Sequence, residues 1–98
     1  MTPLKLVTII AEEVLEATLE KEIITLGAKG YTVATVRGKG EQGKRESIWE
    51  GENVKIETIV SEEVSNKILD HLQRKYFDKY AMVAYVSDVQ VVRTQHFI

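Results

Sequence analysis

Residues 54–63 carry the pattern that decides the fold: Val54-Lys55-Ile56-Glu57-Thr58-Ile59-Val60-Ser61-Glu62-Glu63. The first seven positions alternate at period two, which predicts a strand whose core face is made of Val54, Ile56, Thr58 and Val60. Ser61 can cap a following helix by accepting a backbone N–H, and two glutamates in the first turn suit the positive end of the helix dipole. The segment therefore predicts a strand that passes directly into a helix.

Apolar residues at three- and four-residue steps predict two amphipathic helices. One stripe comprises Val14, Leu15, Leu19, Ile23 and Leu26, and the other comprises Val64, Ile68, Leu69, Leu72 and Tyr76. Gly27 ends the first helix, because glycine tolerates the positive φ that often follows a helix. Further β-branched and apolar runs predict strands over 4–10, 31–37 and 82–92, the last of them bent or bulged near Ser87-Asp88.

The resulting order is β-α-β-β-α-β, and each helix needs one face of the sheet to bury its stripe. With right-handed crossovers this order predicts an α+β, ferredoxin-like sandwich, in which two helices cover one face of an antiparallel sheet. The chain has 98 residues, of which 44% are hydrophobic and 29% are charged. That composition is typical of a globular protein, so we expect a single domain over residues 1–98.

Several classes of function are disfavoured by composition. The chain has no cysteine, which excludes disulfides, thiol nucleophiles and thiolate metal sites, and its only histidines are His71 and His96. A net charge of −2 argues against general nucleic-acid binding. No nucleophile sits beside a histidine, so we expect no enzyme activity and no metal. No apolar run approaches the ~18–20 residues of a membrane span, and a cytoplasmic location is the expectation.

The segment from Gly38 to Asn53 is the unusual part of the sequence. Its 16 residues include four glycines and seven charged residues, and it lies between two predicted strands. It matches the frames of a dinucleotide fingerprint and of a P-loop, but both motifs need a helix after the last glycine, and a strand follows instead. Closely spaced glycines can still form an anion-binding nest, and Lys39, Lys44 and Arg45 add positive charge. A plain flexible hairpin loop is the alternative, which the length of the segment disfavours.

Ile48 and Trp49 are apolar residues within this charged segment. A tryptophan in such a setting either docks on its own oligomer or anchors a partner. Docking within the oligomer is the more common outcome. We retain both interpretations for Lys44, Ile48 and Trp49.

Three short stretches, in order, resemble the PII superfamily of signalling proteins across nearly the whole chain. They are Gly27-Ala28-Lys29-Gly30-Tyr31-Thr32-Val33, Gly38-Lys39-Gly40 and Val54-Lys55-Ile56-Glu57. The first two, together with Tyr80-Ala81, are most similar to the PII-like branch associated with bicarbonate transport, the SbtB group. The resemblance implies a homotrimer with nucleotide sites in the clefts between subunits and a mobile T-loop, here about 38–53, at each cleft.

The resemblance also implies roles for individual residues. Thr32 matches a threonine near the adenine, and Gly38, Lys39 and Gly40 match the base of the T-loop that wraps the phosphate. Gln42 falls where PII proteins carry a glutamine at the ligand site, whereas the SbtB group has an arginine there. Arg45 matches a second, phosphate-binding arginine of that group. The strand near Ala84 and Tyr85 is expected to supply backbone edges for the base.

Departures from the family pattern narrow the range of nucleotides that we expect as the ligand. The loop is shorter than in true PII proteins and lacks their modifiable tyrosine, and Tyr80-Ala81-Met82-Val83 replaces a glycine-rich phosphate loop together with its lysine. The chain ends at Ile98 without the cysteine-containing tail of some relatives. AMP, cyclic AMP or ADP therefore suits the sequence better than ATP with 2-oxoglutarate.

The prediction is a regulatory sensor that requires no cofactor, takes an adenine nucleotide as its ligand and acts through its T-loop. The implied partner is a bicarbonate or other membrane transporter, contacted on its cytoplasmic face. Two alternatives stay open: a trimeric metal-tolerance protein resembling the CutA family, and a trimeric scaffold that binds a partner through Trp49 without any ligand.

Overall fold

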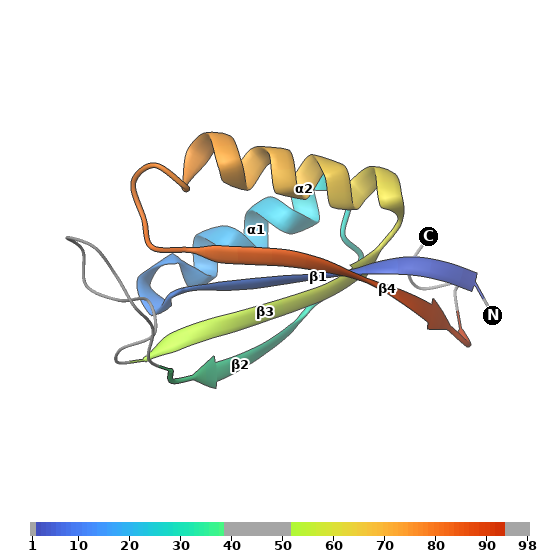
Figure 1. Cartoon of the computed structure of the whole chain (residues 1–98), viewed down its shortest axis with the longest axis horizontal. Helices are drawn as coiled ribbons and strands as arrows, with labels where there is room; N and C mark the ends of the chain where they lie inside the picture. Colours follow the sequence, from blue (N-terminus) through green and yellow to red (C-terminus); the bar gives the residue numbers. More distant parts are fainter. Residues whose placement is uncertain (1, 39–51, 94–98) are drawn as a thin grey trace.

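The computed structural model describes residues 2–38 and 52–93, and their order of elements is the predicted one (Figure 1). Strand β1 (Thr2–Glu12) leads through a 3-10 turn, η1 (Glu13–Leu15), into helix α1 (Glu16–Leu26). The other elements are β2 (Thr32–Val36), β3 (Asn53–Val60), α2 (Glu62–Lys75) and β4 (Val83–Val91).

The four strands form one antiparallel sheet in the order β2-β3-β1-β4, and both helices lie on the same face of it (Figure 1). This arrangement confirms the predicted ferredoxin-like sandwich. The covered side of the sheet is called here the helix face, and the other side the open face. Because side chains alternate along a strand, the register between strands assigns every strand residue to one of the two faces.

A single core fills the space between the helix face and the helices. The sheet contributes Val7, Ile9, Ala11, Val54, Ile56 and Val60, and the helices contribute Leu15, Leu19, Ile23, Ile68, Leu72 and Tyr76. The predicted core positions of the strand over 54–60, Thr58 included, are all buried. Most of both predicted helix stripes is buried as well, because each stripe packs against this face.

The helix signals in the sequence are also confirmed. The Ser61 hydroxyl accepts a hydrogen bond from the Val64 N–H at 3.2 Å, which caps α2. Gly27 follows α1 with φ +125°, while the N–H groups of Gly27 and Ala28 donate to the carbonyls of Ile24 and Ile23. This is the paired bonding of a glycine-terminated helix. A Cβ at Gly27 would lie 2.9 Å from a methyl carbon of Val64, so this glycine is also required by packing.

Three details of the prediction are wrong. Val14 is 79% exposed, because it lies in the 3-10 turn before α1, where Leu15 takes the inward position. Of the two forms predicted for β4 near Ser87-Asp88, bent or bulged, the bulge is absent, since the pairing with β1 runs in unbroken register from Val83 to Val91. Asn53 belongs to β3 and not to the loop: it is buried and pairs with Glu12 and Val36.

Within residues 2–38 and 52–93, no helix is both long and apolar enough to cross a bilayer.

Candidate functional site

The open face of the sheet is rich in apolar residues although no helix covers it. By register, β1 contributes Leu4, Leu6 and Ile10, β3 contributes Ile59, and β4 contributes Val83, Tyr85, Val89 and Val91. Tyr85 is 47% exposed, and most of the others are partly exposed. An open face of this kind suits contact with another chain or with a ligand.

One row of side chains crosses the open face from edge to edge. Thr32 on β2 lies opposite Glu57 on β3, Glu57 lies opposite Thr8 on β1, and Thr8 lies opposite Tyr85 on β4. Thr32 and Tyr85 were both predicted to contact a nucleotide. The structure places them on one face but at opposite edges, about 14 Å apart if neighbouring strands are ~4.8 Å apart.

A pocket of about 340 Å³ opens at the Thr32 end of this row. Its lining residues are Leu6, Gly30, Tyr31, Thr32, Glu57, Thr58 and Ile59. The Thr58 hydroxyl donates a 2.6 Å hydrogen bond to the Gly30 carbonyl, which ties the α1–β2 connection to β3 and shapes one wall. Its volume is at the lower end of the roughly 300–1,000 Å³ of small-molecule sites.

Sequence reasoning did not name Glu57 as a site residue. The signal was available, because the alternation that places Ile56 and Thr58 in the core sends Glu57 and Lys55 to the open face. Glu57 adds a carboxylate beside Thr32 that can accept hydrogen bonds.

The remaining predicted nucleotide contacts divide into two groups. Gly38 is exposed just after β2, and Ala84 is the second residue of β4, where it pairs with Ile9 and packs against the core. Ala84 therefore turns its side chain away from the open face, and only its backbone can contact a ligand. Outside the described residues lie Lys39, Gly40, Gln42 and Arg45, together with the predicted partner-binding residues Lys44, Ile48 and Trp49.

The predicted contact residues Thr32 and Tyr85 lie on the two edge strands of the sheet, β2 and β4. Among the strands that the structure describes, β2 pairs with β3 alone and β4 pairs with β1 alone. An edge strand has backbone N–H and C=O groups that can bind a ligand or another chain. Both edges of this sheet therefore have binding capacity next to predicted contact residues.

Comparison with known proteins identifies the family. The model of the family described as nitrogen regulatory protein P-II matches residues 4–96. The chain belongs to the P-II family. This confirms the resemblance read from the sequence, while the SbtB-like branch is compatible with the match and stays a prediction.

Solved structures of other P-II proteins show the same fold. A PII-like signalling protein from Thermus thermophilus is 54% identical, with a TM-score of 0.85, and the alignment covers 99% of this chain and 97% of that one. CPII from Thiomonas intermedia K12, bound to ADP and bicarbonate, is 29% identical, with a TM-score of 0.84 and coverage of 99% and 96%. A further CPII structure holds ADP, AMP and acetate, with a TM-score of 0.82, identity of 29% and coverage of 97% and 94%. The expected class of ligand, an adenine nucleotide, is thus the class found in this relative.

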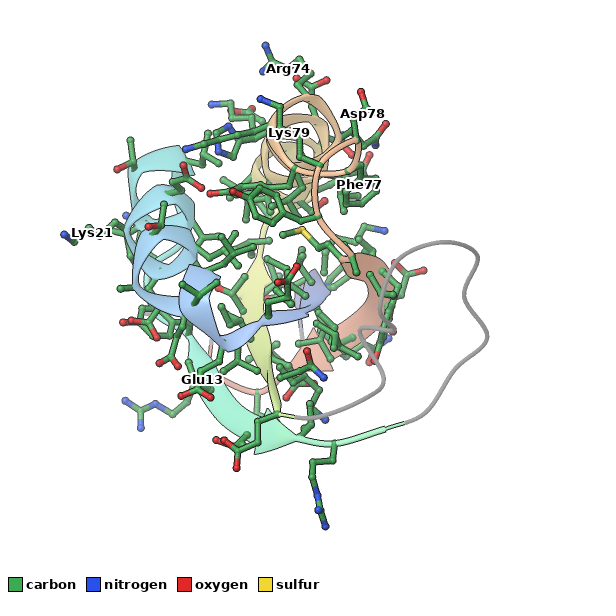
Figure 2. The ribbon with its side chains drawn as sticks, turned by 90° about the vertical axis from the view of Figure 1, so that its left-hand side faces the viewer. Glu13, Lys21, Arg74, Phe77, Asp78 and Lys79 are labelled. Carbon is green, nitrogen blue, oxygen red and sulfur yellow. The ribbon has the colours of Figure 1, made fainter. Side chains whose placement is uncertain are left out.

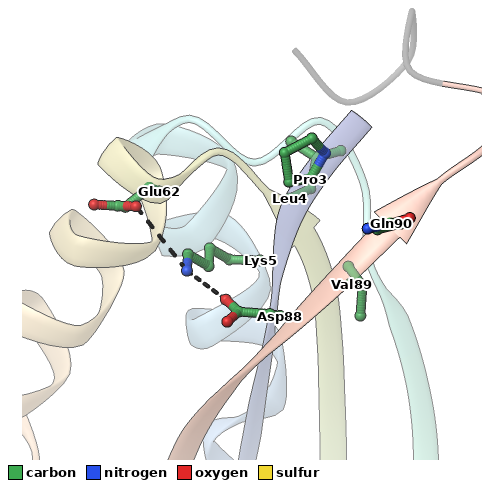
Figure 3. Close-up of a pocket in the computed structure, with 7 residues that line it drawn as sticks. All are labelled: Pro3, Leu4, Lys5, Glu62, Asp88, Val89 and Gln90. Carbon is green, nitrogen blue, oxygen red and sulfur yellow. Dashed lines mark hydrogen bonds and ion pairs between the residues drawn. The ribbon is translucent and has the colours of Figure 1, made fainter. Parts of the chain in front are cut away.

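A second pocket of this P-II chain, of about 430 Å³, lies where β1 and β4 meet the start of α2 (Figure 3). The Lys5 ammonium points into it and forms a hydrogen-bonded ion pair with Asp88, while Glu62 lies 4.0 Å away. The hydrogen bond to Asp88 raises the pKa of Lys5. Because two carboxylates surround one ammonium, this pocket does not suit a phosphate, and it contains none of the predicted contact residues.

A polar cluster joins the two helices and was missed by sequence reasoning. The Tyr76 hydroxyl donates to Glu22 Oε1 at 2.5 Å, Lys75 pairs with Glu22 Oε2, and His71 Nε2 lies 3.2 Å from Oε1. His71 lies on α2, where its side chain is partly buried and faces Glu22. No periodicity reveals such a cluster, since its members belong to different helices.

Burial and hydrogen bonding have opposite effects on the pKa of Glu22. Burial would raise the pKa of Glu22, but the hydrogen bonds from Lys75 and Tyr76, with His71 Nε2 close by, outweigh it and hold the pKa below the usual value. Burial and the hydrogen bond to Glu22 raise the pKa of Tyr76 to about 12. The side chains therefore form an ionic cluster around a charged carboxylate.

Proposed function

We propose that this chain is a nucleotide-sensing signal-transduction protein, which binds AMP, cyclic AMP or ADP in the clefts of a homotrimer and regulates a partner through its T-loop. One observation carries the proposal. Thr32 and Tyr85 share the open face but lie at opposite edges of the sheet. A site that uses both edges at close range needs two chains, with the β2 edge of one subunit beside the β4 edge of the next.

The apolar open face supports the trimer. Leu6, Ile10 and Ile59 lie at its centre, on the two inner strands, where the isolated chain leaves them partly exposed. Closed rotational symmetry would let three copies cover these faces together, as is usual for homo-oligomers. The nucleotide cleft would then lie at the rim of the same interface.

The ligand class is supported by the likeness to CPII, which spans nearly the whole of both chains. Thr32 is the first residue of β2, and Gly38 lies just past its other end, after Val36 and Arg37. A nucleotide lying along this edge would have its adenine near Thr32 and its phosphate near the loop that starts at Gly38. We assign Lys39, Gly40, Gln42 and Arg45 to that phosphate, and Ala84 and Tyr85 to the base. Bicarbonate, present in a CPII structure, is a candidate second ligand.

Signalling is proposed to work by order and disorder of the T-loop, which starts at Gly38 and ends before Asn53, the first residue of β3, within a single domain over 1–98. A nucleotide that binds one loop state better than another shifts the population towards that state. Lys44, Ile48 and Trp49 would then meet the partner, a bicarbonate or other membrane transporter of the SbtB-associated kind. Adenine nucleotides are cytoplasmic signals, so we place the protein in the cytoplasm, membrane-associated only through its partner, and without enzyme activity.

Calorimetry tests the proposal directly. Purified protein is titrated with AMP, cyclic AMP, ADP and ATP, with and without bicarbonate, while light scattering gives the mass in solution. We expect a trimer that binds at least one of the first three nucleotides. Arg45→Ala should weaken binding by roughly 1.5–3 kcal/mol, the range for a hydrogen bond to a charged group. A monomer, or no heat with any nucleotide, would overturn it.

The two alternatives make different predictions. The family match is to P-II and gives the CutA-like metal-tolerance alternative no support. The scaffold alternative predicts that Trp49→Ala abolishes partner binding equally with and without nucleotide. The sensor predicts instead that partner binding depends on which nucleotide is present.

A further inference from the structure

The connection between α2 and β4 begins at Tyr76, whose hydroxyl is hydrogen-bonded to Glu22 on α1. Tyr76 follows the last residue of α2, is 2% exposed and places its hydroxyl 2.5 Å from Glu22 Oε1. The same carboxylate is paired with Lys75 and contacted by His71, also from α2. Among the residues that the structure describes, the charged and titratable groups that contact this carboxylate come from the end of α2, while Lys21 lines the small hollow beside it.

From Tyr76 onward the chain is held by a short series of contacts. The Tyr76 carbonyl accepts hydrogen bonds from the N–H groups of Lys79 and Tyr80, both at 2.9 Å. The rings of Tyr76 and Tyr80 lie 5.7 Å apart, centre to centre, in a tilted contact. Tyr80 and Met82 then pack against the core just before β4 begins at Val83. Residues 77–82 are thus linked to Tyr76 by hydrogen bonds and ring contacts.

This connection leads into the residues that the proposed function assigns to the nucleotide base. Ala84 and Tyr85 are the second and third residues of β4, and Ala84 packs on the same core as Tyr80 and Met82. Figure 2 shows Phe77, Asp78 and Lys79 around the end of α2, with Phe77 exposed to 41%. The pairing of β4 with β1 begins at Val83, so the connection over 77–82 lies outside that pairing and directly precedes Ala84 and Tyr85.

We propose that Glu22 is a positioning residue for the nucleotide site: by holding Tyr76 across the two helices, it sets the course of residues 77–82 and thereby the entry into Ala84 and Tyr85. The effect on affinity rests on the proposed function, whereas the anchoring of the connection does not. Glu22 itself lies on α1, behind the helix face, and need not touch the ligand. Its action is therefore exerted through Tyr76.

The test compares three changes to the cluster with a matched control at the other end of α2. Glu22→Ala removes the carboxylate, Tyr76→Phe removes only the hydroxyl, and Glu22→Gln keeps an acceptor for that hydroxyl but loses the charge. The control, Asp88→Asn, breaks the ion pair of Lys5 beside Glu62, at the start of α2. Amide hydrogen exchange and ADP calorimetry are measured on the full chain for each variant.

For Glu22→Ala we expect faster exchange confined to residues 77–82, and ADP binding weakened about three- to tenfold, as for couplings of roughly a kilocalorie per mole. Tyr76→Phe should show the same pattern more weakly, and Glu22→Gln should recover part of the affinity. Asp88→Asn should leave ADP affinity within about twofold, since exposed ion pairs contribute little.

Three results would overturn the proposal. One is unchanged exchange at 77–82 in both Glu22→Ala and Tyr76→Phe. Another is a uniform rise in exchange across β1 and β3, which would indicate a general loss of stability. The third is ADP affinity that falls as much in Asp88→Asn as in Glu22→Ala. If Glu22→Ala does not fold, Tyr76→Phe, which keeps the buried ring, decides alone. Wild-type protein that binds no nucleotide would instead remove the proposed function, while the exchange measurement would still decide the anchoring.

Discussion

The two faces of the sheet are built from similar residues but are completed in different ways. On the helix face, Val7, Ile9 and Ile56 are fully buried by the chain's own helices. On the open face, Leu6, Ile10 and Ile59 lie on the same two strands and remain partly exposed. The comparison teaches that alternation alone does not distinguish a face that the chain's own helices cover from one that they leave partly exposed.

The largest expected effect is on the helix face. Ile56→Ala should lower the free energy of unfolding by about 2–5 kcal/mol, because it removes a fully buried side chain and leaves a cavity. Chemical denaturation measures the loss. The matched change on the open face, Ile59→Ala, should cost clearly less at protein concentrations where the chain is monomeric. Equal losses from the two changes would contradict the distinction between the faces.

The next largest effect on stability is expected at Gly27, where α1 ends. Gly27→Ala should destabilise the fold by about 1–3 kcal/mol, since alanine is strained at φ +125° and its Cβ would press on Val64. Gly30→Ala is the control, as a Cβ there has open space and φ is not positive. Thermal unfolding of the two variants gives the measurement. A Gly27→Ala protein as stable as the control would show that this helix end can rearrange.

On the open face the expected change is in assembly and not in folding. Leu6→Glu places a charge at the centre of this face, so light scattering should report a smaller species than for the wild type. Circular dichroism should remain close to that of the wild type, because the helix-face core is untouched. A variant that still forms the wild-type oligomer would mean that the subunits meet elsewhere.

The polar cluster around Glu22 predicts that the stability of the fold changes at acid pH. Because the pKa of Glu22 is lower in the folded chain than its usual 4.5, the carboxylate contributes stability above that pH. The contribution is lost as the pH falls below 4.5 and through the folded-state pKa. Glu22→Gln should therefore lose less stability than the wild type between neutral and acid pH, as followed by denaturant unfolding. Parallel pH profiles would argue that the carboxylate has no such role.

The smallest effect is expected at the Lys5 junction. Asp88→Asn should change the free energy of unfolding by only about 0–1 kcal/mol, because the Asp88 side chain is 84% exposed and water screens the pair. Lys5→Met tests the same pair from its less exposed side. A loss of several kilocalories per mole in either variant would show that this junction contributes to the core.

Much of this molecule was predictable from local patterns. The strand over 54–60, the Ser61 cap and the end of α1 at Gly27 each depend on neighbours in the sequence, and each is confirmed. The misplaced Val14 and the absent bulge in β4 depend on how elements meet, which periodicity does not encode. Of the predicted contact residues, Thr32 and Tyr85 were brought to one face, whereas Arg45 and Trp49 lie outside the described residues.

By itself the sequence determined the order of elements, the inward face of the strand over 54–60 and most of both helix stripes, because hydrophobic periodicity, caps and glycines act over a few residues. The family followed separately, from the resemblance of short motifs. Only the tertiary structure decided that Thr32 and Tyr85 stand at opposite edges of the sheet, that Glu57 joins their row, and that Glu22 reaches Tyr76 across two helices. The reason is physical: strand order and helix packing bring together residues that are distant along the chain, and no local pattern specifies those distances.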